Sequence, residues 1–94
     1  MLLETTYKTG DTISLKLTSG EELVGRLEEE KDKQITMHKP MVLVANQQGL
    51  GLAPFMFSVS GDKFNINTNV IVCVAKTEDG LAKQYIKQTT GIVT

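Results

Sequence analysis

The sequence predicts a mainly β domain: a small, strongly bent, five-stranded antiparallel barrel with a C-terminal α-helix. Three observations indicate this fold class. Apolar and polar residues alternate with a period of two near the N-terminus, Gly25 interrupts a strand pattern, and the period changes to that of a helix near the C-terminus. We expect a single domain over residues 1–94, with the barrel at about residues 12–76 and the helix at about residues 78–90.

The composition fits one soluble globular domain. Of the 94 residues, 40% are hydrophobic and 22% are charged, and no apolar run is long enough to cross a bilayer. The N-terminus has neither the basic start nor the apolar stretch of a secretory signal, so we expect a cytoplasmic protein. A net charge of −1 argues against a nucleic-acid binder, unless folding or assembly gathers basic groups on one face.

The first predicted hairpin contains the interrupted strand. Ile13, Leu15 and Leu17 alternate with polar residues, and a turn at Ser19–Glu21 leads into a second strand with the same period. Gly25 lies inside this second strand, where a glycine usually marks a bulge, a bend or a close approach of two backbones. We therefore expect Gly25 to let the strand curl across the barrel.

A charged run separates the second strand from a third. Glu28–Lys33 predicts the exposed end of one strand and the turn into the next, which runs over about Ile35–Val44. Within the third strand, Pro40 indicates an edge position, a bulge or an interruption. Met41–Ala45 is apolar on both faces, so we expect it to be covered twice, by closure of the barrel or by another subunit.

Amides and glycines mark the second half of the barrel. Asn46–Leu52 is predicted to be a loop, because its amides and two glycines break the alternation. Ala53–Asn67 is a hairpin candidate with a two-residue turn at Gly61 and Asp62, a tight polar connection follows at residues 67–69, and Val70–Lys76 forms the last strand. The strand count is five, or six if the fourth strand folds back on itself.

The C-terminal segment has helical spacing. Thr77 is a candidate N-cap, and the acids that follow it suit the positive end of a helix dipole. Gly91 is the expected C-cap, with Ile92 folding back on the last turn. Apolar residues between these caps predict a face that must dock on another surface: Leu81, Ala82, Tyr85 and Ile86.

The sequence contains no catalytic or metal-binding constellation. Cys73 is the single cysteine and lies in an apolar run, so we expect a buried core thiol and no internal disulfide. His38 is the single histidine, is expected to face outward, and cannot alone build a zinc site within one chain. Symmetry in a ring would repeat His38, which leaves an intersubunit metal or a pH-sensitive contact open. We expect no enzyme activity, no metal and no cofactor.

The segment around Gly25 resembles the first motif of the Sm-like family. That motif is an alternating strand, a glycine-containing hairpin, a glycine in the second strand, and an aspartate before an alternating apolar pair. Residues in these places here, with one extra residue before the aspartate, are Gly20, Glu21, Leu23, Gly25, Leu27, Asp32, Ile35, Thr36 and Met37. Thr36 replaces the usual asparagine, and Gln34 stands where the family often has a residue that stacks on a base. The second family motif matches poorly at Ile66–Val72, where Asn67 and Thr68 replace the usual arginine and glycine. The helix also follows the strands here, whereas family members commonly carry theirs first.

The resemblance implies a strongly bent barrel and a ring of identical subunits, in which strand four of one subunit pairs with strand five of the next. It also implies that loops at a central pore bind single-stranded RNA. The candidates carried over are Asp32, Gln34, Thr36, Asn67, Thr68 and Asn69. All of these side chains can form hydrogen bonds, but none can stack on a base, and Glu28–Glu30 nearby would repel phosphates. Apolar residues on the expected edges also favour assembly: Phe55, Phe57, Val70, Val72 and Val74.

Other interpretations stay open. The ring could be a structural or protein-interaction scaffold that binds no RNA, with the C-terminal helix as the docking surface for a protein partner. A monomeric SH3-like or OB-like barrel is a further alternative, which the mass in solution would distinguish. Lys76, Lys83 and Lys87 are either a solvated surface or a basic stripe for nucleic acid.

Overall fold

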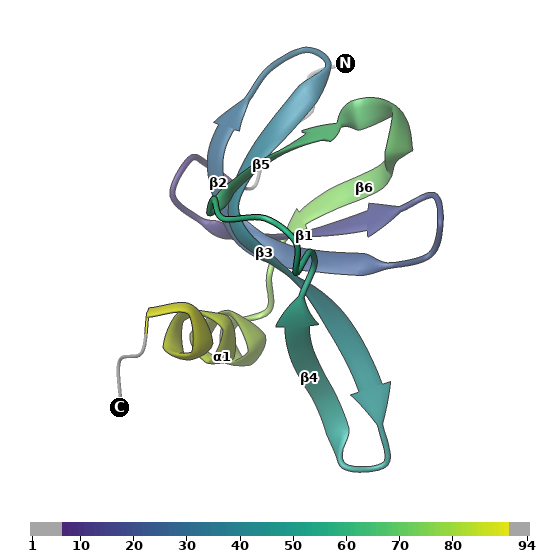
Figure 1. The fold of residues 1–94 in the computed structure, drawn as a ribbon, viewed down its shortest axis with the longest axis vertical. Coiled ribbons are helices and arrows are strands. Elements are labelled where there is room, and N and C mark those ends of the chain that lie inside the picture. The colour runs from purple at the N-terminus through teal and green to yellow at the C-terminus, as the bar shows by residue number, and fades with distance from the viewer. Residues whose placement is uncertain (1–6, 91–94) are drawn as a thin grey trace.

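The computed structural model describes residues 7–90 and has a mainly β fold with one C-terminal helix (Figure 1). Its elements in chain order are β1 (Thr12–Leu17), β2 (Glu22–Glu30), β3 (Gln34–Asn46), β4 (Gly49–Pro54), β5 (Lys63–Asn67), the 3₁₀-helix η1 (Thr68–Val70), β6 (Ile71–Lys76) and α1 (Asp79–Thr90). The six strands form one antiparallel sheet in the order β4-β3-β2-β1-β6, and β5 pairs with β3 off this path. The antiparallel β class and the C-terminal helix are confirmed, whereas the sheet is open between β4 and β6 in the described residues.

Two adjacent predictions in the second half of the sheet are wrong. The expected loop at Asn46–Leu52 is instead mostly strand, because β3 extends to Asn46, β4 begins at Gly49, and a two-residue turn joins them. Gly49 has a φ of 120°, and Asn46 Oδ1 accepts a hydrogen bond from the Gln48 N–H at 2.8 Å. The expected hairpin at Ala53–Asn67 does not form, because β5 pairs with the first half of β3 instead. That pairing sets Ile66 opposite Ile35, and both side chains are buried.

A sharp irregularity in β3 lies beside Gly25. The register between β2 and β3 shifts between Val24 and Arg26, and Lys39 has a positive φ of 48° next to Pro40. A Cβ atom at Gly25 would lie 2.6 Å from Met37 Cε and 3.2 Å from Pro40 Cα, so only a glycine permits this approach of the two backbones. The irregularity divides β3 into one half that pairs with β5 and another that pairs with β4.

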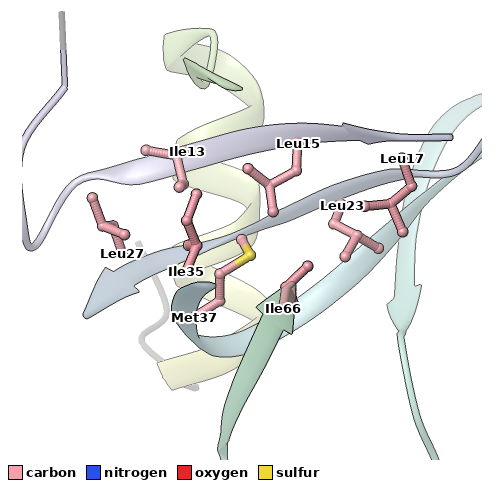
Figure 2. Close-up of a cluster of buried hydrophobic side chains, with 8 residues drawn as sticks. All are labelled: Ile13, Leu15, Leu17, Leu23, Leu27, Ile35, Met37 and Ile66. Atoms are coloured by element: carbon pink, nitrogen blue, oxygen red, sulfur yellow. The ribbon is translucent and has the colours of Figure 1, made fainter. Parts of the chain in front are cut away.

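The core lies on one face of the sheet, where side chains from β1, β2, β3 and β5 point toward one another (Figure 2). Its buried members are Ile13, Leu15, Leu17, Leu23, Leu27, Ile35, Met37 and Ile66. The expected double coverage of Met41–Ala45 is not present within residues 7–90, since Val44 is 40% exposed and Ala45 is also exposed. The hairpin of β3 and β4 instead projects away from the rest of the sheet (Figure 1).

Cys73 is exposed, so the prediction of a buried core thiol is wrong. In the pairing of β6 with β1, Val74 lies opposite the buried Leu15, and Cys73 lies opposite Lys16. Alternation therefore turns Cys73 toward solvent with Lys16, although its neighbours in sequence are apolar. The apolar run of β6 is therefore not buried on both faces, and its Val72 is 62% exposed.

The helix forms as predicted over Asp79–Thr90, but two details differ. Its N-terminal hydrogen bonds go to the Glu78 side chain, which accepts from the N–H groups of Gly80 at 2.8 Å and Leu81 at 3.0 Å. Thr77, the expected N-cap, is buried and its hydroxyl shares a 2.8 Å hydrogen bond with that of Ser14.

Only part of the expected docking face of α1 is covered. Tyr85 is buried, whereas Ile86 is 45% exposed, so the described chain covers only part of this apolar face. The expected cap at Gly91 and Ile92 lies outside the described residues. No membrane-spanning helix is present among residues 7–90.

Candidate nucleic-acid interface

Two polar segments from distant parts of the chain meet at one end of the sheet. The turn after β2 is closed by a 2.9 Å hydrogen bond from the Lys31 N–H to the Gln34 carbonyl, and Asp32 lies inside this turn. The Thr68 N–H, at the start of η1, donates to the Lys33 carbonyl at 3.0 Å. This bond brings the two segments side by side.

The pairing of β3 with β5 places the remaining candidates next to this contact. Gln34 lies opposite Asn67, and Thr36 lies opposite Asn65. The Thr36 hydroxyl donates to Asn65 Oδ1 at 2.7 Å. Because side chains alternate along a strand, these four polar residues share the face opposite to the buried Ile35 and Ile66.

The 3₁₀-helix holds the last of the candidates. Asn67 Oδ1 accepts a hydrogen bond from the Asn69 N–H at 2.8 Å, which fixes the Asn67 side chain as the N-cap of η1. Asn69 is exposed and Thr68 is half-buried. All six residues expected from the sequence therefore lie at one end of the sheet. Asn65 was not among the predicted residues, although it lies one period of the strand before Asn67.

A row of basic side chains lies further along the same face. Arg26 on β2 lies opposite His38 on β3, and His38 lies opposite Lys63 on β5. Glu28 Oε1 accepts from Arg26 Nη2 at 2.7 Å, and its other oxygen is 3.9 Å from Lys63 Nζ. The Arg26 hydrogen bond is the main reason that the pKa of Glu28 is lowered. Arg26 and Lys63 thus share one counterion, which weakens their attraction for a phosphate.

His38 is half-buried, with 22% of its side chain exposed. Its ring is in an outward row, as expected, and its Nε2 is 4.0 Å from Asp62 Oδ2. Burial lowers the pKa of His38, and the nearby Arg26 charge lowers it further, while Glu28 and Asp62 oppose this shift. The neutral imidazole is therefore favoured in the folded protein.

The acidic side chains of Glu28–Glu30 at the end of β2 form ion pairs or hydrogen bonds with neighbouring side chains. Glu29 is 3.5 Å from Lys31 Nζ, and Glu30 accepts a 3.0 Å hydrogen bond from the Tyr7 hydroxyl. Partial burial, then the Glu30 hydrogen bond, raises the pKa of Tyr7. With Glu28 bound to Arg26, the repulsion that this run exerts on a nucleic acid is smaller than its sequence indicates.

No group of three or more His, Cys, Asp or Glu side chains within residues 7–90 has the geometry of a metal site. The chain matches no model of a known protein family, and no curated protein matches its sequence.

Proposed function

We propose that this chain is a divergent Sm-like protein that forms a ring and binds single-stranded RNA through loops at the pore, as a cytoplasmic and non-catalytic module. The observation that carries the proposal is the contact between the turn after β2 and η1. The resemblance assigns these two segments to one RNA site, although they are separated by the whole of β3, β4 and β5. The 3.0 Å bond between Thr68 and Lys33 supports that assignment.

The bend in β3 supports the barrel. One half of β3 pairs with β4 and the other with β5, so β4 and β5 together correspond to a single fourth strand that the segment 55–62 interrupts. On this interpretation the five strands of the barrel are β1, β2, β3, the interrupted β4 and β5, and β6. Gly25 and Pro40 lie at the point where the sheet must turn.

The edges of the sheet support the ring. β4 and β6 end the strand path, and each carries an exposed apolar side chain, Leu50 at 59% and Val72 at 62%. Of the residues expected on apolar edges, Phe57, Val70 and Val72 are exposed, whereas Phe55 and Val74 pack against the core. Pairing of β4 from one copy with β6 of the next would cover both edges. Light scattering should then give a multiple of 10.3 kDa, and a monomer at micromolar concentration would refute the ring.

The proposed RNA contacts are hydrogen bonds from amides and hydroxyls to base edges. No aromatic residue is present in the two segments. Lys31 in the turn lies 3.5 Å from Glu29, and Arg26 and Lys63 share the Glu28 carboxylate, so we expect weak binding. Labelled oligo(U) and oligo(A) should be titrated at two salt concentrations against the natural chain, a double variant Gln34→Ala/Asn67→Ala and the control Glu22→Gln. The proposal predicts binding that only the double variant loses. Absence of binding by the natural chain at low salt would refute it.

A scaffold ring without RNA is the second candidate. The pairing of Arg26 and Lys63 with Glu28 favours it, because an RNA site usually leaves such cations free for phosphates. On this alternative α1 is the docking surface for a protein partner. An assembled ring that binds neither oligonucleotide at low salt would select the scaffold over the RNA-binding protein.

A further inference from the structure

A pocket of about 340 Å³ lies where the end of α1, the bend of β3 and the segment between β4 and β5 meet. Its size falls at the lower end of the range for ligand sites. The apolar part of its wall consists of Pro40, Met41, Pro54, Met56, Val59 and Phe64. None of the six RNA candidates lines it, so the pocket is independent of the proposed RNA site.

Two polar side chains of the pocket form hydrogen bonds with the backbone, whereas the Asp62 side chain does not in the described part of the chain. Lys39 Nζ donates to the Thr89 carbonyl at 2.8 Å, and Gln88 Nε2 donates to the Leu52 carbonyl at 3.3 Å, so both are occupied by the fold. The Asp62 side chain is 61% exposed and forms no hydrogen bond within residues 7–90. The one cationic partner within 4.0 Å of its carboxylate in this part of the chain is His38.

His38 neutralises Asp62 poorly near neutral pH. Its burial and the Arg26 charge keep the pKa of the imidazole below the usual value of 6.5. The result is an apolar pocket with an unneutralised carboxylate at its edge. Such a site is complementary to a positive charge carried by an apolar group.

We propose that this pocket binds an apolar segment of a protein partner that carries a lysine or arginine opposite Asp62. The apolar surface extends beyond the pocket, since Phe57, which does not line it, is 83% exposed, and the wall residues Met56 and Val59 are each 43% exposed; this extent favours a polypeptide over a small amine. Methionine side chains at the wall adapt readily to an apolar partner. The carboxylate repels phosphate groups, which argues against a nucleic acid in this pocket.

The probe is a fluorescein-labelled peptide, Gly-Leu-Phe-Arg-Leu-Phe-Gly, and its matched partner has glutamate in place of arginine. Fluorescence anisotropy with the whole chain should show tighter binding of the arginine peptide. Asp62→Asn should weaken that binding about threefold, in line with a solvent-exposed ion pair. Asp62→Lys should reverse the preference between the two peptides. Glu22 is an exposed residue outside the pocket, and Glu22→Gln changes the net charge by the same amount as Asp62→Asn. This control should leave the affinity unchanged.

Amide chemical shifts in ¹⁵N-labelled protein locate the peptide. The proposal requires changes at Met41, Gly61, Phe64 and Thr89, which line the pocket, and circular dichroism of each variant shows that it folds. Equal affinity for both peptides, unchanged binding by Asp62→Lys, or shifts confined to other residues would overturn it. Self-association that Val59→Asp abolishes would also overturn it, because the occupant would then be a second copy of the chain.

Discussion

The Tyr85 hydroxyl on α1 lies 2.5 Å from the carbonyl oxygen of His38 on β3. The same hydroxyl accepts a hydrogen bond from the Arg26 N–H on β2 at 3.2 Å and lies 3.0 Å from the Lys39 carbonyl. These backbone groups belong to the irregularity beside Gly25, where the register between β2 and β3 shifts. One side chain of the helix thus supplies hydrogen bonds that the disrupted strand ladder cannot.

Tyr85→Phe should therefore destabilise the protein. The substitution keeps the ring but leaves the Arg26 N–H and a carbonyl of β3 without this partner, so we expect a loss of about 1–3 kcal/mol. Chemical denaturation measures the free energy of unfolding. The control is Tyr7→Phe, whose hydroxyl donates to the exposed Glu30 and should contribute less than about 1 kcal/mol. Equal losses in the two variants would show that the Tyr85 hydroxyl has no special role.

Gly25→Ala tests the close approach of β2 and β3. The added Cβ would meet Met37 Cε at 2.6 Å and Pro40 Cα at 3.2 Å, and although the methionine can move, the proline backbone cannot move freely. Overpacking of this kind costs about 1–3 kcal/mol of stability. Gly61→Ala is the matched control, since a Cβ there meets nothing within 4 Å and the change should be close to neutral. Unchanged stability of Gly25→Ala would contradict this explanation of the glycine.

The stability should depend on pH through His38. Because its folded pKa lies below 6.5, the unfolded chain binds more protons in the interval between the two values. The contribution of the neutral imidazole is therefore complete above pH 6.5 and is lost as the pH falls toward the folded pKa. His38→Gln should lose less stability than the natural chain on acidification through this interval, as measured by urea unfolding. A natural chain that gains stability relative to His38→Gln would mean that Asp62 and Glu28 dominate over burial.

Local patterns were sufficient to predict β1, β2 and α1, and pairing over long distances explains the errors. The alternation from Ile13 to Leu17 and the glycine at position 25 depend on neighbours in sequence or on one hairpin. By contrast, the pairing of β5 with β3 sets Ile66 opposite Ile35, which lies 31 positions earlier in the sequence, and no local period encodes such a contact. Cys73 was misjudged for a related reason, since its exposure depends on the pairing of β6 with β1, which sets it opposite the exposed Lys16.

The candidate RNA site was predicted by resemblance and not by any local rule. Polar residues such as Gln34 and Asn67 are unremarkable in sequence, and their adjacency follows from the pairing of β3 with β5. Asp62 was predicted only as part of a turn. Its position beside both His38 and an apolar pocket depends on how the segment 55–62 crosses from β4 to β5.

Lysine substitutions on the edge strands test the ring most directly. Val72→Lys on β6 and Leu50→Lys on β4 would each place a charge on an apolar edge that the proposed pairing buries, so light scattering should show smaller particles for both. Ile86→Lys is the control, because Ile86 is 45% exposed on α1 and lies on neither edge. Since each edge belongs to the same interface, either substitution alone should interrupt every contact around a symmetric ring. An assembled natural chain whose mass neither edge variant changes would show that its interface lies elsewhere.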